Sequence, residues 1–257
     1  MWLGLGRDAL AHDFWIDTKP TATAVGTQVS VSLYAGEQLR GDSVPRIEDW
    51  FKRFSLIQPD GAETTISGVM GDDPAGAFTV TQTGVHHLVY RSTSGFAEQE
   101  IPAFKDYLQT EGVEHLLGDW LDTVPTPVAA REEYYRCAKN LLAVGSDHLG
   151  FDRVVGLELE LTALDDPFAD AAAGIRINLS FRGAPLAHAL VVARNANNSG
   201  EQLHARTDGS GNVRLNVSGS GFWLIKAVHL VAAPADSGLT EWMSFWASLT
   251  FLKEATN

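Results

Sequence analysis

A histidine and an aspartate stand side by side at positions 12 and 13, directly after a short leader-like stretch. Residues 9–11, Ala-Leu-Ala, have the small-x-small form of a signal-peptidase site, and cleavage there would make His12 the first residue of the mature protein. A free α-amine and an imidazole on one residue can chelate a transition metal, and Asp13 adds a carboxylate beside them. The alternative is that His12 only begins an edge strand whose anchors are Phe14 and Trp15.

The other histidines could complete such a site. His86 and His87 are adjacent on a predicted strand, so their side chains point to opposite faces and only one of them can join a given site. His148 follows Asp147 in a predicted loop and is either a ligand or a turn residue. None of the histidines has the HExxH pairing of a helical zinc site, and each has a structural role as its alternative. The metal site that we predict is drawn from His12, Asp13, His86, His87 and His229.

The predicted donors are nitrogen and carboxylate groups without a thiolate. Such a set suits nickel, cobalt, copper or zinc, and the sequence does not choose among them. Enzymatic motifs are missing, because there is no GxSxG elbow, no P-loop and no Rossmann glycine pattern. We therefore expect a protein that is not an enzyme. The catalytic alternative is a copper enzyme that uses His12 as an N-terminal brace.

Composition restricts the possible partners. The chain has 257 residues, a net charge of -13 and a pI near 4.9, which argues against nucleic acid and anionic membrane surfaces as partners. The single cysteine, Cys137, excludes an intramolecular disulfide. No stretch approaches the ~18 consecutive apolar residues of a membrane-spanning helix.

Alternating apolar and polar residues predict a mostly β protein. Strands are expected over 24–33, 54–57, 78–80 and 85–90, and they would form an antiparallel sandwich in the first ninety residues. A helical insertion is expected at about 102–145. Its predicted helices cover 102–112, 113–121 and the stretch from Thr126-Pro127 to Gly145, with Cys137 on an apolar stripe and Glu132 paired with Arg136 on the solvent side.

The period returns to two after Val154. Strands are expected over 157–162, 175–181, 187–193, 221–230 and 246–251, and a hairpin is expected to join 204–207 to 213–217 through the turn 208–212. An Ig-like or prealbumin-like sandwich accounts for this part. The predicted organisation is a signal-peptide remnant at 1–11, an N-terminal β-sandwich with its helical insertion at 12–153 and a C-terminal sandwich at 154–257.

A set of short motifs spans nearly the whole chain after residue 11. They are His12-Asp13-Phe14-Trp15 and residues 36–37, 104–112, 131–145, 156–160, 183–186, 207–209, 223–229 and 246–251. In order and spacing they resemble those of a known family of exported bacterial proteins of unknown function, once associated with the nickel-uptake protein NikM. The resemblance implies a periplasmic protein with a carboxypeptidase-regulatory-like C-terminal sandwich and a link to nickel or cobalt uptake.

These observations lead to a functional expectation with two alternatives. We expect a periplasmic, non-catalytic binding protein for a transition metal or a metal complex, supporting nickel or cobalt uptake together with an envelope transport protein. The first alternative is an envelope structural or interaction module that binds no metal. The second is the copper enzyme.

Overall fold

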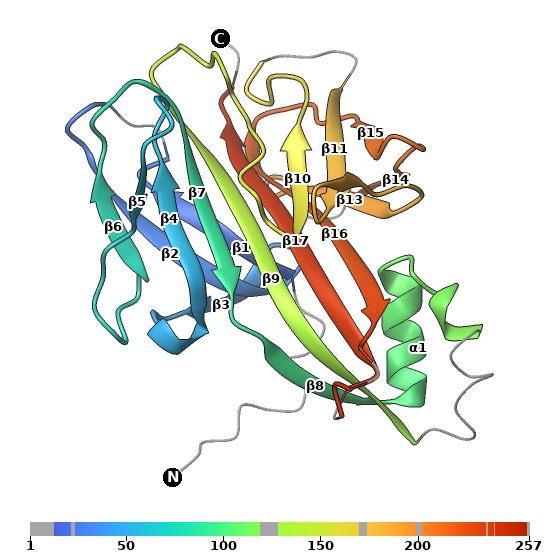
Figure 1. The fold of residues 1–257 in the computed structure, drawn as a ribbon. Helices are drawn as coiled ribbons and strands as arrows, with labels where there is room; N and C mark the ends of the chain where they lie inside the picture. Colours follow the sequence, from blue (N-terminus) through green and yellow to red (C-terminus); the bar gives the residue numbers. More distant parts are fainter. Residues whose placement is uncertain are drawn as a thin grey trace.

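The computed structural model describes residues 13–21, 24–118, 128–169, 174–198, 202–234, 236–238 and 240–255. The protein is mostly β, as predicted, and its strands form three sheets (Figure 1). No helix among these residues is long and apolar enough to cross a membrane. The elements are β1 (Asp13–Lys19), β2 (Gln28–Glu37), β3 (Arg40–Val44), η1 (Glu48–Trp50), β4 (Phe51–Ile57), β5 (Glu63–Thr65), β6 (Gly76–Thr79), β7 (Gly84–Ser92), β8 (Gly95–Glu100), α1 (Ile101–Thr110), β9 (Ala129–Val144), β10 (Leu159–Ala163), β11 (Ile175–Phe181), β12 (Ala184–Pro185), β13 (Leu190–Asn195), β14 (Gln202–Arg206), β15 (Asn212–Leu215), β16 (Gly221–Ala232) and β17 (Trp242–Lys253).

The largest sheet has nine strands and runs through the middle of the molecule. Its order is β14-β13-β16-β17-β9-β7-β4-β5, and β8 continues along β9 beyond the end of β7. The central strand β9 pairs with β7 and β8 on one edge and, in parallel, with β17 on the other. Strands from both predicted sandwiches therefore share one sheet, and the expectation of two separate sandwiches is not confirmed.

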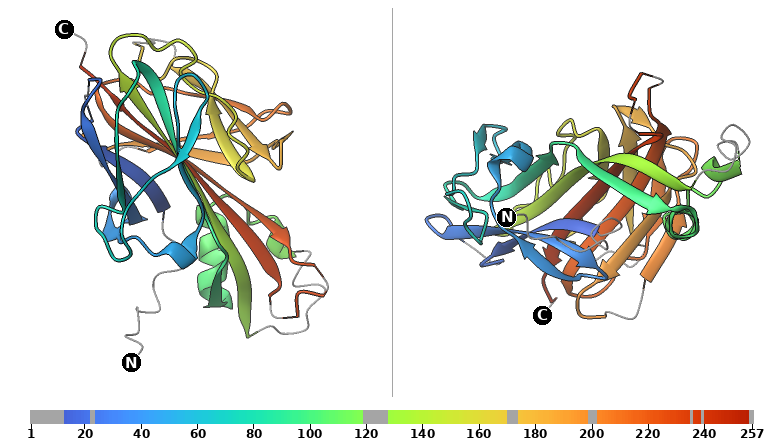
Figure 2. Two further views of the ribbon diagram at one scale, coloured as in Figure 1. Left: turned by 60° about the vertical axis from the view of Figure 1, so that its left-hand side comes forward. Right: turned by 90° about the horizontal axis from the view of Figure 1, so that it is seen from below.

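Two small sheets cover opposite faces of the large one. The first small sheet, formed by β1, β2, β3 and β6, packs against β4, β7 and one face of β9. We call this the even-numbered face, because the even-numbered residues of β9 point to it. The core between the sheets includes Ile16, Leu33 and Leu88. Strands β10, β11, β12 and β15 pack against the other face, where Leu161 and Ile177 meet Leu249. Figure 2 shows the resulting layers from two further directions. The middle strands are thus buried on both faces.

The α1 helix covers the even-numbered face of the large sheet, where the first residues of β9 lie beside the first residues of β17 and the last residues of β16. Pro102 lies in its first turn, where a missing N–H costs no hydrogen bond. The predicted apolar stripe is observed, because Phe104, Tyr107 and Leu108 are buried against the tryptophans of β17. The ring of Tyr107 stacks on that of Trp246 with centroids 5.6 Å apart.

The predicted helix that would end at Gly145 is wrong. Residues 129–144 form β9, the longest strand in the described part of the chain, and Thr126-Pro127 lies outside that part. A strand buried on both faces shows no alternation of apolar and polar residues, so the period-two pattern that predicts half-buried strands is absent from it. The apolar residues at three- and four-residue spacing in fact fall on both faces. Tertiary pairing with β7 and β17 overrides the helix-forming composition.

Three further predictions about this region meet different outcomes. The pair of Glu132 and Arg136 does not face solvent: Glu132 is 1% exposed, and the guanidinium of Arg136 lies over the rings of Phe14 and Tyr134. The prediction of a buried Cys137 is confirmed. Besides α1, residues 116–118 are helical within the second predicted helix.

The predicted hairpin around residues 208–212 is also wrong. Although a tight turn at Asp208 joins the two strands, β14 pairs with β13 in the large sheet and β15 pairs with β11 in a small one. The turn therefore carries the chain from one layer to the other. Local turn residues predict a reversal of direction, but they do not predict which partner each strand takes.

Candidate ligand-binding pocket

The parallel ladder between β9 and β17 ends before the strands do. Its last pair joins Leu141 to Phe251, yet β9 continues to Val144 and β17 to Lys253. Each strand keeps its outer partner over this stretch, since Val144 still pairs with Gly84 and Lys253 with Gly221. The carboxyl ends of two neighbouring parallel strands thus run on without pairing to each other.

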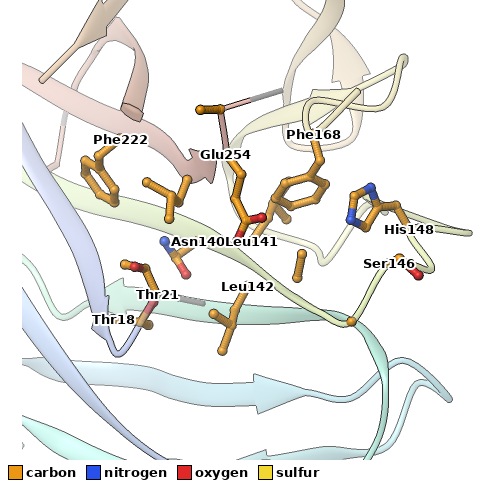
Figure 3. Close-up of a pocket in the computed structure, with 14 residues that line it drawn as sticks. Thr18, Thr21, Asn140, Leu141, Leu142, Ser146, His148, Phe168, Phe222 and Glu254 are labelled. Carbon is orange, nitrogen blue, oxygen red and sulfur yellow. The ribbon is translucent and has the colours of Figure 1, made fainter. Parts of the chain in front are cut away.

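A pocket of about 510 Å³ lies at this place (Figure 3). Side chains alternate along a strand, so the pocket receives groups from both faces of the sheet. Asn140, Phe222 and Thr18 lie on the side of β1, whereas Phe168 and His148 lie on the opposite side. The carboxylate of Glu254 points into the space between Asn140 and Phe168.

Asn140 is the polar group that the protein leaves incompletely bonded in the pocket. Its amide nitrogen donates to the hydroxyl oxygen of Thr250 at 3.0 Å and, at 3.5 Å, to the carbonyl oxygen of Ile16. Thr250 donates to the same Ile16 carbonyl oxygen at 2.8 Å. The amide oxygen of Asn140 has no hydrogen-bond partner, although the residue is only 2% exposed. A buried acceptor left without a donor costs about 1–3 kcal/mol. Water does not reach this oxygen in the structure, so a ligand donor would recover that cost only after a small movement of the pocket wall.

Aromatic rings form the opposite wall. The His148 imidazole lies with its ring centroid 4.7 Å from that of Phe168, which in turn contacts the edge of Phe251. The Nδ1 atom of His148 lies 3.3 Å from Oδ2 of Asp166, and this contact orients the ring. The wall therefore offers flat apolar surfaces and one imidazole held by a carboxylate.

A buried ionic cluster anchors the loop that carries His148. The ammonium of Lys139 lies 2.7 Å from Asp152 and 3.4 Å from Glu160, and all three side chains are at most 1% exposed. Burial raises the pKa of the Asp152 carboxyl, but Lys139 and His87 outweigh it and hold that pKa below its usual value. Glu160 also accepts hydrogen bonds from three backbone N–H groups of residues 155–157. The cluster pins residues 152–157 to the odd-numbered face of β9.

Of the two predicted metal donors at the N-terminus, His12 and Asp13, the structure describes only Asp13. His12 lies outside the described residues. Asp13 is 4% exposed, and its carboxylate lies 2.6 Å from the ammonium of Lys226, which also lies 2.9 Å from Glu111. Burial lowers the pKa of Lys226, but the two carboxylates outweigh it and raise that pKa overall. Asp13 is thus already committed to an ion pair and does not present a free carboxylate to a metal.

His86 and His87 lie on opposite faces of β7, as predicted. His86 faces the small sheet that contains β6, where its ring stacks near Phe78. Neither ring nitrogen of His86 has a hydrogen-bond partner. His87 faces the ionic cluster, with Nε2 3.5 Å from Asp152. Burial lowers the pKa of both imidazoles. These rings remain neutral in the core.

His229 lies near the carboxyl end of β16, and its ring packs edge-to-face with that of Phe181, with the centroids 4.6 Å apart. Burial, helped by His115 and Arg182, lowers its pKa to about 4. Within the described residues, no group of three or more His, Cys, Asp or Glu side chains is placed to hold a metal ion. The residues present there do not fit the predicted metal site, because Asp13, His86, His87 and His229 have separate surroundings.

Sequence reasoning considered His148 only as a metal ligand or a turn residue, and it missed the other residues of the pocket. Asn140 was hidden inside the stretch assigned to a helix, so its position beside Thr250 was not visible. The signal that could have found it is the pair Lys139-Asn140 inside the otherwise apolar run 137–144, because buried polar side chains in such a place need partners.

Comparisons with known proteins give a family without a function. A family model described as a domain of unknown function, DUF4198, matches residues 9–231. No curated protein matches the sequence. Among solved structures, the D0-D1 domain of intimin aligns with 93% of this chain and 97% of its own length, at 13% identity and a TM-score of 0.22. A similarity at that score supports no conclusion about function.

Proposed function

Because the chain belongs to the DUF4198 family of domains of unknown function, we propose its function from its own pocket: it is a non-catalytic binding protein for a small ligand. The observation that carries the proposal is the unpartnered amide oxygen of Asn140 in a pocket of about 510 Å³. Pockets of roughly 300–1,000 Å³ with a few placed polar groups among apolar walls are typical of small-molecule sites. The protein acts in the periplasm in this proposal, after release at residues 9–11.

We propose that the transition-metal ligand, if one is bound, is a metal complex and not a bare ion. A bare ion needs several protein donors at one point, and the described residues do not gather them. A metal complex brings its own donors and needs only a shaped pocket with a few hydrogen-bonding groups. We therefore propose that any nickel or cobalt cargo of this protein is bound as a complex. An envelope transport protein would then receive it.

Blocked-pocket variants test the proposal. Ser146 and Thr21 line the pocket from two sides, so Ser146→Trp and Thr21→Trp each place an indole at it. Ser94→Trp, at an exposed position between β7 and β8, is the matched control. Saturation-transfer NMR with benzylammonium, benzyl alcohol and benzoate should show at least one probe bound to wild type and control and displaced in both blocked variants. Binding of no probe to wild type, or equal binding to all four proteins, would overturn the proposal.

A further inference from the structure

Two residues of the pocket, Asn140 and Glu254, offer oxygen atoms that only accept hydrogen bonds. The other polar groups of the lining can donate or accept, and they are the hydroxyls of Thr18, Thr21 and Ser146 and the imidazole of His148. Asn140 presents a carbonyl oxygen, because its amide nitrogen is already used by Thr250. Glu254, which is exposed, presents a carboxylate to the pocket. A ligand that matches them has N–H donors, and a positive charge would complement Glu254.

Turning the Asn140 amide over does not change this conclusion. Its oxygen would then face Thr250, whose hydroxyl proton is already directed to Ile16. To bond the flipped oxygen, Thr250 would have to turn its hydroxyl away from Ile16, whose carbonyl would then lose both of its side-chain donors. The flipped amide would also leave two donors unpaired in place of one acceptor. The orientation that keeps the chain of hydrogen bonds leaves the oxygen as the free group.

The aromatic walls favour the same ligand class. Phe222 lies on one side of the pocket and Phe168 on the other, so a ligand there meets apolar side chains from both faces of the sheet. Ring faces attract cations, which adds to the carboxylate of Glu254. The whole chain carries a net charge of -13, and such a field draws cations toward the protein.

We infer that the pocket at the end of the β9–β17 ladder selects a cation that carries N–H donors, held by the Asn140 oxygen, the Glu254 carboxylate and the aromatic walls. The inference rests on the proposed function and deepens it, since it names the ligand class of the same pocket. Two kinds of compound share this chemistry: a protonated organic amine with an apolar body, and a cationic metal complex with ammine or amine ligands.

Calorimetric titration of the full chain with three probes tests the inference. Benzylammonium and benzyl alcohol share their apolar body and differ in charge and donors, and hexaamminecobalt(III) represents the metal complexes. We expect benzylammonium to bind about tenfold or more tightly than benzyl alcohol, as a charged hydrogen bond predicts. Tighter binding of hexaamminecobalt(III) than of benzylammonium would assign the site to metal complexes, and the reverse order would assign it to organic amines.

Two substitutions check that the named groups are responsible. Glu254→Gln removes the charge at an exposed position, so folding is preserved, and it should weaken benzylammonium about tenfold while leaving benzyl alcohol unchanged. The matched control is Glu98→Gln, an exposed carboxylate on β8. Asn140→Leu removes the acceptor itself and should weaken both cations, with circular dichroism reporting whether the variant folds.

The outcomes separate the two proposals. Equal affinity for benzylammonium and benzyl alcohol, or no effect of Glu254→Gln, would overturn the ligand class and leave the pocket as a binding site. Loss of all probe binding, in wild type as well as in the variants, would overturn the proposed function too. Weakening by Glu98→Gln equal to that by Glu254→Gln would show that net charge and not the pocket attracts the cation.

Discussion

The amide nitrogen of Asn140 lies 3.0 Å from the hydroxyl oxygen of Thr250, the residue directly opposite it in the parallel ladder. The Thr250 hydroxyl donates a hydrogen bond to the carbonyl oxygen of Ile16, so side chains of β9 and β17 and the backbone of β1 are joined by one chain of hydrogen bonds. These hydrogen bonds hold the Asn140 side chain at the pocket and leave its amide oxygen as the end without a partner.

Removing the middle member of this chain should destabilise the fold. Thr250→Val keeps the side-chain shape and deletes the hydroxyl. The Ile16 carbonyl and the Asn140 amide then lose their bonds to Thr250 in a buried place and keep only their own long contact of 3.5 Å. We expect a loss of about 1–3 kcal/mol in the free energy of unfolding, measured by urea denaturation. Thr65→Val on the exposed strand β5 is the control and should change little. Equal losses in the two variants would show that the hydrogen bonds contribute nothing specific.

Glu132 should make stability fall as the pH rises. Burial raises the pKa of this carboxyl to about 7, whereas the ordinary value is 4.5. The folded state therefore binds more protons than the unfolded state between pH 4.5 and 7. Its contribution is fully present below pH 4.5 and is lost as the pH rises through 7. A pKa raised from 4.5 to about 7 corresponds to about 3 kcal/mol.

Glu132→Gln tests this dependence, because it replaces the carboxyl by a neutral group of the same shape. The variant should be more stable than wild type at pH 8 by up to about 3 kcal/mol, and the difference should vanish toward pH 4. Glu133→Gln, the neighbour on the opposite face of β9, is the control. A wild-type pH profile that Glu132→Gln leaves unchanged would contradict the assignment.

Lys226 holds two buried carboxylates, those of Asp13 and Glu111. Lys226→Met should cost about 3–5 kcal/mol, since both carboxylates lose their partner away from solvent. Lys52→Met, at an exposed position in β4, should cost far less. The triple variant that adds Asp13→Asn and Glu111→Gln should regain part of the lost stability in thermal unfolding. No recovery would mean that packing of the lysine chain, and not its charge, carries the effect.

The Cys137 thiol should be inert in the folded protein. It is 1% exposed, and burial raises its pKa to about 11. Alkylation by iodoacetamide at pH 8 should therefore label the native protein far more slowly than the urea-unfolded protein, as mass spectrometry would record. Labelling at the same rate in both states would place the thiol at the surface.

The sequence predicts strands best where only one face is buried. The alternation over 175–181 coincides with β11, whose pattern of buried and partly exposed residues is visible in the sequence. The alternation fails at β9, where Glu132 and Lys139 are as buried as the leucines beside them. Their burial depends on partners from distant segments, which a local window does not contain.

The candidate site was predictable only in part for the same reason. The opposed orientation of His86 and His87 follows from the geometry of any strand and is observed. Asp13 was expected to be a metal ligand, but its environment is set by Lys226, more than two hundred positions away in the sequence. Asn140 is a pocket group only because Thr250 lies 110 residues further along the chain and takes its amide nitrogen.

The same separation has a consequence during folding. One edge of β9 meets β7 and β8, which precede or adjoin it in the chain, whereas the other edge needs β17, which follows it by about a hundred residues. Until residues 242–253 pair with β9, the folding chain carries an open edge along residues 132–141, and such edges template pairing with other chains. Docking of β17 is therefore the step that closes the central sheet against aggregation.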